Sequence, residues 1–185
     1  MNSDKIIELL EAYFDFEDSK TKGKQLKEII QLAKEATAHF YQDNENAFLL
    51  LNKARNLMTN YWNQIKNYPS WQLSPDFQKA KKEYLKAELF GYLIKNKKIG
   101  LPKLPIIIEP EEYLEVLTGF IKELTQKADF LAENQKYETL KEIKEIIVNF
   151  YVELANSKIN QLISPFLNEI KTCIRKIEDT LLDFA

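Results

Sequence analysis

The stretch KKEYLKAELFGYL, residues 81–93, decides the fold and poses the functional question. Its apolar residues recur at helical spacing, so it belongs to a predicted amphipathic helix from about Pro75 to Lys95. Glu83 is a carboxylate on a face that is otherwise aromatic and aliphatic. Either it joins carboxylates of neighbouring helices to hold a divalent metal, or it is a helix-surface or partly buried carboxylate that pairs with Lys79 or Lys86.

Composition points to helices. The chain has 185 residues, with only 4 glycines and 6 prolines, which is too little turn chemistry for many strands. We therefore expect an all-α fold, a bundle of about six to seven helices that forms one domain over residues 1–185. The single cysteine excludes an internal disulfide.

Charge and hydropathy limit the partners. With 26 basic and 28 acidic residues the formal net charge is −2, so any electrostatic site must come from local clustering. The first residues contain no apolar run typical of a secretory signal, and no stretch approaches the ~20 apolar residues of a membrane helix. We expect a cytoplasmic protein with no membrane partner.

Apolar periodicity predicts the helices and prolines mark the breaks. The first helix, residues 3–40, is either continuous or interrupted near Gly23. Breaks are expected at residues 43–46 and 67–75, and a loop from Lys95 to Pro110. Further helices should begin at Pro110, after Asn134 and at Ser164, and the joint at residues 156–161 is ambiguous.

Several pieces occur in an order, spacing and helix phase that resemble the translin family, which includes translin and its partner Trax. They are IIELLEAYFDFEDSKTKGKQLKEII (6–30), KEYLKAELFGYLI (82–94), EEYLEVLTGFIKEL (111–124), ETLKEIKEIIVNFYVELANSKIN (138–160) and LNEIKTCIRKIEDTLLDF (167–184). The resemblance implies about seven helices, assembly into a hollow homo-oligomer such as an octamer, and binding of single-stranded RNA or DNA.

The resemblance also bears on catalysis, because Trax-type subunits are metal-dependent endoribonucleases and translin-type subunits are not. Of the family's acidic positions, the first glutamate falls on Glu83 and the second on Lys86. The aspartate falls on Gly119, and a further glutamate on Glu123. A hard cation needs several oxygen ligands, so we expect no catalytic residue, metal or cofactor. Glu83 and Glu123 would be catalytic, with Mg²⁺, only under the alternative of a Trax-type nuclease.

Binding of single strands requires basic clusters and aromatic rings. Three lysine clusters qualify: Lys20, Lys22, Lys24 and Lys27; Lys79, Lys81, Lys82 and Lys86; and Lys95, Lys97, Lys98 and Lys103. Such runs are also common on solvated helix faces. The predicted nucleic-acid contacts are Arg55, Lys53, Lys79, Lys82, Lys86, Lys20 and Lys24.

Three functions therefore stay open at this point. The first is a non-catalytic oligomer that binds single-stranded RNA or DNA. The second is a metal-dependent endoribonuclease of Trax type. The third is a structural subunit of a hetero-oligomer with a catalytic paralogue. Lys86 and Gly119, where carboxylates would be needed, favour the first.

Overall fold

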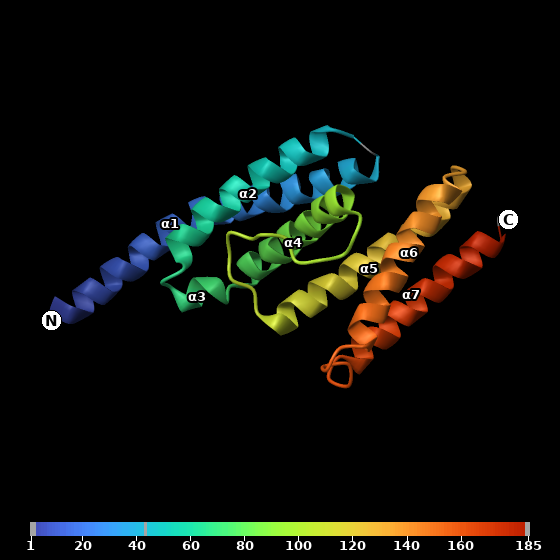
Figure 1. The fold of residues 1–185 in the computed structure, drawn as a ribbon. Coiled ribbons are helices and arrows are strands. Elements are labelled where there is room, and N and C mark those ends of the chain that lie inside the picture. The colour runs from blue at the N-terminus through green and yellow to red at the C-terminus, as the bar shows by residue number, and fades with distance from the viewer. Residues whose placement is uncertain (1–2, 43, 184–185) are drawn as a thin grey trace. The chain divides into compact units, whose positions relative to one another are not determined.

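The computed structural model describes the backbone of residues 3–42 and 44–183, and the side chains of residues 21–42 and 44–183. These residues form α-helices and no strand (Figure 1), which confirms the all-α fold. The helices are α1 (Ser3–Tyr41), α2 (Asn46–Ile65), α3 (Pro69–Gln72), α4 (Pro75–Asn96), α5 (Pro110–Glu133), α6 (Tyr137–Ala155) and α7 (Ser164–Asp183). Within these ranges no helix combines the length and the apolar character needed to cross a bilayer.

The chain divides into two compact units. One comprises Met1–Ala87 with Leu104–Ile106, and the other Glu88–Lys103 with Ile107–Ala185. The boundary falls inside α4, so this helix supplies residues to both units. The single domain expected for residues 1–185 stays a prediction, and each unit is described by itself.

In the first unit, α1 and α2 lie side by side and antiparallel (Figure 1). Over the side chains described from residue 21 onward, both helices bury apolar residues at the predicted helical spacing. The buried residues include Leu26, Ile29, Ala33, Ala36 and Phe40 of α1, and Ala47, Leu51, Ala54 and Met58 of α2. α1 continues through Gly23 without a break. One glycine costs a helix only about 1 kcal/mol relative to alanine, which is less than the packing of this long stripe contributes.

The start of α4 is fixed to α2 by aromatic stacking. Phe77 is fully buried, and its ring lies 5.6 Å from Tyr61 and 6.2 Å from Trp62, centroid to centroid. Ser74 Oγ accepts a hydrogen bond from the Phe77 backbone N–H at 3.3 Å, and Pro75 occupies the first helical position, where its missing N–H is harmless. The expected start at Pro75 is therefore confirmed.

The four-residue helix α3 occupies a segment that we expected to be only a break. Pro69 stands at its N-terminus, and the Gln72 side-chain amide donates to the Lys66 carbonyl oxygen at 2.8 Å. This bond ties the segment to the end of α2. A single turn has too few residues to show a hydrophobic period, so the sequence pattern does not reveal it.

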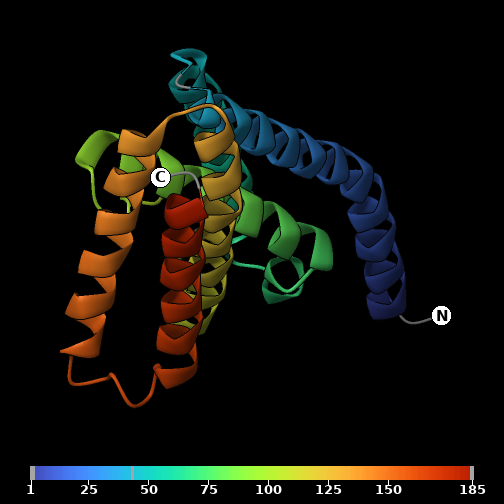
Figure 2. The ribbon, with the colours of Figure 1, turned by 90° about the vertical axis from the view of Figure 1, so that its right-hand side faces the viewer.

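In the second unit, α5, α6 and α7 pack on one another as three neighbouring helices (Figure 2). Phe120, Leu124, Leu140, Ile147 and Ile177 are among their buried residues. Phe90, from the part of α4 that belongs to this unit, meets Phe120 edge to face with ring centroids 4.7 Å apart. α5 begins at Pro110 as expected, with a capping box in which the Glu112 carboxylate accepts from the Glu109 backbone N–H at 3.4 Å.

Candidate functional site

Glu83 of the first unit is paired with a lysine. The ammonium of Lys86, one turn further along α4, lies 3.1 Å from a Glu83 carboxylate oxygen. The Glu83 side chain is 21% exposed and that of Lys86 is 25% exposed, so water still reaches the pair. The predicted pairing of Glu83 with a lysine one turn away is therefore confirmed, and the carboxylate is partly buried. A fixed ammonium at this distance competes with any metal cation for the same carboxylate.

Gly119 and Glu123 lie on α5 in the second unit. A Cβ added at Gly119 would meet no atom within 4 Å, so close packing does not explain the glycine. Glu123 is half-buried. Among the side chains that the structure describes, those of residues 21–42 and 44–183, no three His, Cys, Asp or Glu form a group that could hold a metal.

The predicted nucleic-acid contacts differ in accessibility. Lys24, Lys53 and Lys79 are exposed, whereas Lys82, Lys86 and Arg55 are half-buried. The Arg55 guanidinium donates to the side-chain oxygen of Asn52 at 3.4 Å, and Lys86 holds Glu83. The side chain of Lys20 lies outside the described residues. Of the predicted contacts whose side chains are described, Lys24, Lys53 and Lys79 are therefore the ones most accessible to a phosphate.

Helix phase splits the first lysine cluster. Lys22 is only 8% exposed, and its ammonium lies 4.3 Å from the centre of the Trp71 ring, a cation–π contact. Lys24 and Lys27 are exposed on the opposite side of α1, since residues of a helix advance by 100°. Lys22 therefore contributes to packing within the first unit.

Lys34 belongs with Lys24 and Lys27, although it was not in the predicted set. All three are exposed, and at 100° per residue they fall within an arc of about 80° that extends ~15 Å along the helix. We call them the α1 lysine stripe. Counting helix phase over residues 24–34 would have found Lys34, whereas proximity in sequence did not.

The lysines of the other two predicted clusters also divide into exposed and buried side chains. Lys81 is only 6% exposed. Lys95, Lys97, Lys98 and Lys103 are all exposed on the end of α4 and the following loop, in the second unit. Lys97 adopts the left-handed backbone conformation, with φ of 53°, and its ammonium pairs with Glu142 of α6 at 3.2 Å. This pair ties the beginning of the loop to α6.

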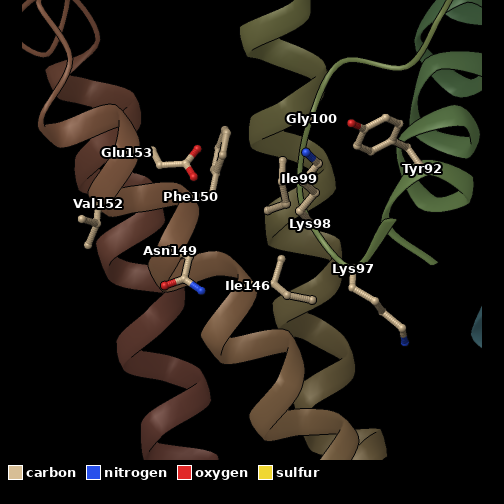
Figure 3. Close-up of a pocket in the computed structure, with 10 residues that line it drawn as sticks. All are labelled: Tyr92, Lys97, Lys98, Ile99, Gly100, Ile146, Asn149, Phe150, Val152 and Glu153. Carbon is tan, nitrogen blue, oxygen red and sulfur yellow. The ribbon is translucent and has the colours of Figure 1, made fainter. Parts of the chain in front are cut away.

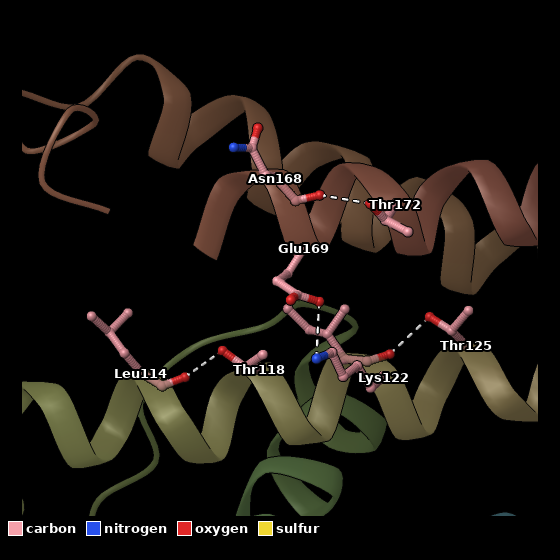
Figure 4. Close-up of polar contacts among 8 residues, drawn as sticks. Leu114, Thr118, Lys122, Thr125, Asn168, Glu169 and Thr172 are labelled. Carbon is pink, nitrogen blue, oxygen red and sulfur yellow. Dashed lines mark hydrogen bonds and ion pairs between the residues drawn. The ribbon is translucent and has the colours of Figure 1, made fainter. Parts of the chain in front are cut away.

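A polar row between α5 and α7 has a structural role (Figure 4). Lys122 of α5 and Glu169 of α7 form an ion pair at 2.9 Å. The hydroxyls of Thr118, Thr125 and Thr172 each donate to the carbonyl oxygen four residues earlier, at 2.7, 2.9 and 3.0 Å. With their protons committed to the backbone and no base beside them in these contacts, the hydroxyls are not activated nucleophiles.

Comparisons with known proteins bear on the fold. No protein-family model matches this sequence. No curated protein matches it either. Among solved structures, the chain is similar to one in the crystal structure of apo-NeC3PO, with 19% identity, 97% of each chain covered and a TM-score of 0.75. It is also similar to one in the crystal structure of AfC3PO, with 17% identity, 97% of this chain and 95% of that chain covered and a TM-score of 0.65. These likenesses confirm the translin-like fold.

Proposed function

We propose that this chain is a non-catalytic subunit of a hollow, translin-like oligomer that binds single-stranded RNA or DNA through lysine contacts to phosphate. The translin-like fold carries the proposal, because the sequence resemblance associates that fold with hollow assemblies that hold single strands. The preference for RNA or DNA is left open, since phosphate contacts alone do not distinguish the two.

The α1 lysine stripe supports phosphate binding. Lys24, Lys27 and Lys34 present three ammonium groups along one exposed helix face. With a formal net charge of −2, the chain depends on such local clusters to attract a polyanion. Contacts of this kind release counterions from the nucleic acid and carry little sequence information.

The ion pair on α4 supports the non-catalytic part of the proposal. A two-carboxylate site on this helix would need an oxygen ligand where Lys86 stands, and the Lys86 ammonium instead neutralises Glu83 at 3.1 Å. Metal-assisted phosphodiester cleavage depends on a cation held by several oxygens. Lysine at this position removes a ligand and adds a competing positive charge.

Fluorescence anisotropy with a labelled single strand of about 20 nucleotides tests the proposal. We expect binding at about 50 mM salt that weakens steeply by about 200 mM. Size-exclusion chromatography with light scattering should show an oligomer that retains the strand. Absence of binding at low salt would contradict the proposal. Binding seen only after co-purification with a catalytic paralogue would instead favour a structural subunit of a hetero-oligomer.

A further inference from the structure

A cavity of about 450 Å³ lies within the second unit (Figure 3). The end of α4 contributes Tyr92, the following loop contributes residues 97–100, and α6 contributes the opposite wall. Small-molecule pockets typically have volumes of about 300–1,000 Å³. The cavity is therefore large enough for a small organic ligand, and none of its lining residues belongs to the α1 lysine stripe.

The α6 wall is aromatic and aliphatic. Phe150 is half-buried, so its ring is held by packing and still reaches the cavity. Ile146 lies one turn before it, and the buried side chain of Ile99 lines the loop side. A half-buried ring on a pocket wall offers a stacking surface to a planar ligand.

Three polar side chains on the cavity walls are uncommitted. Lys98 stands on the loop, and Asn149 and Glu153 stand on α6 (Figure 3). None of these three forms a hydrogen bond or ion pair with the part of the chain that the structure describes. Neighbouring Lys97, by contrast, is held by Glu142. The cavity therefore presents an ammonium on one wall, and an amide and a carboxylate on the other.

Close packing positions the loop that carries Lys98. A Cβ added at Gly100 would lie 2.9 Å from a ring carbon of Tyr92, so a larger residue would require the Tyr92 ring to move. Glycine thus allows the loop backbone to approach the Tyr92 ring. Together with the Lys97–Glu142 ion pair, this approach holds both ends of the short segment that contains Lys98.

We propose that this cavity binds one nucleotide, with its base against Phe150 and its phosphate at Lys98. The inference rests on the proposed binding of nucleic acid and adds a site where a single base is recognised. A phosphate is a strong acceptor for an ammonium group. The same chemistry is offered by a free nucleotide and by one unit of a bound strand, so the test includes both.

The polar groups of α6 favour a base that carries an amino group. A carboxylate only accepts hydrogen bonds, and an amide both donates and accepts. Adenine, cytosine and guanine present exocyclic N–H₂ donors, whereas thymine, like uracil, has none. Glu153 beside Asn149 therefore favours a base with such a donor over uracil, and its negative charge keeps the phosphate towards Lys98.

Calorimetric titration of the full chain with adenosine 5′-monophosphate tests the proposal, with uridine 5′-monophosphate and adenosine as comparisons. We expect the adenine nucleotide to bind most tightly. Phe150→Ala and Lys98→Glu should each weaken it at least about tenfold. Lys158→Glu, the same charge change at an exposed lysine that does not line the cavity, should leave it unchanged. Asn149 and Lys98 are exposed, so Asn149→Ala and Lys98→Glu should not disturb packing. These two variants keep the test valid if Phe150→Ala does not fold.

Oligoadenylate and oligouridylate strands form the second arm. If free nucleotides do not bind but the preference for oligoadenylate is lost in Lys98→Glu, the site serves a bound strand. One result would overturn the nucleotide site and leave the proposed function standing. In that result the strands bind without preference for oligoadenylate, the variants do not change their binding, and free nucleotides do not bind. Binding of free nucleotide without any strand binding would support the nucleotide site and overturn the proposed function.

Discussion

Lys86 Nζ lies 3.1 Å from a carboxylate oxygen of Glu83, and both side chains belong to one face of α4. The spacing of three residues on a helix brings the two groups together without distortion of the backbone. Because the pair is partly exposed, it contributes little to stability. Its effect is on the local charge of the face, where the Lys86 ammonium accompanies the Glu83 carboxylate.

A double-mutant cycle of Glu83→Gln and Lys86→Met measures this pair. We expect a coupling free energy of about 0.5 kcal/mol, and less at high salt, because water and ions screen both charges. Urea unfolding of the four proteins provides the measurement. Coupling of several kcal/mol would show that the pair is buried in the assembled protein.

Addition of Mg²⁺ should leave a labelled single-stranded RNA intact, because Glu83 is engaged by Lys86 and Gly119 supplies no carboxylate. A gel-based cleavage assay with EDTA as control checks this expectation. Mg²⁺-stimulated cleavage that disappears in both Glu83→Ala and Glu123→Ala would establish the nuclease alternative.

Phe77→Ala should destabilise the protein by about 3–5 kcal/mol, the range for loss of a buried aromatic side chain. Phe77 is fully buried and stacks on Tyr61 at 5.6 Å, so the substitution removes this stacking of α4 on α2. Phe77→Leu keeps most of the volume and should cost less. Thermal unfolding of the wild type and the two variants provides the measurement. If the Phe77 ring were exposed, both variants would have nearly the stability of the wild type, which would contradict this packing.

Tyr113 gives the second unit a defined response to alkaline pH. Burial, and secondarily the neighbouring Tyr92, raise the pKa of Tyr113 from 10.0 to about 12. Because the unfolded chain loses this proton at lower pH than the folded chain, the free energy of unfolding should fall as pH rises from 10.0 to about 12. Tyr113→Phe removes this contribution, so its unfolding should depend less on pH across that window. Equal slopes for both proteins would contradict the assignment.

Helix starts were predictable where local chemistry marks them. Pro75 after Ser74, and Pro110 before Glu112, set the starts of α4 and α5 by capping and a pre-set backbone angle. Gly23 carried an ambiguous signal, because a lone glycine weakens a helix without ending it. Its outcome depends on packing against α2, which local sequence does not encode.

The candidate site was less predictable, because it depends on which side chains share a face and which segments meet. Lys22 and Lys24 are neighbours in sequence, yet one lies over Trp71 and the other is exposed. The cavity of the second unit brings together Lys98 and Phe150 of α6, which are some fifty residues apart in the chain. Periodicity within one helix carries no information about which distant segments line the same cavity.

The salt dependence of strand binding tests the central claim most directly. Wild type is compared with a variant that carries Lys24→Gln, Lys27→Gln and Lys34→Gln, and with a control that carries Lys158→Gln, Lys171→Gln and Lys176→Gln at exposed positions. A plot of log K against log salt has a slope of about −0.7 for each phosphate contact to a single strand. We predict that the stripe variant loses about 2 units of slope and that the control keeps the wild-type slope. Equal slopes for all three proteins would contradict the claim that the α1 lysine stripe binds the strand.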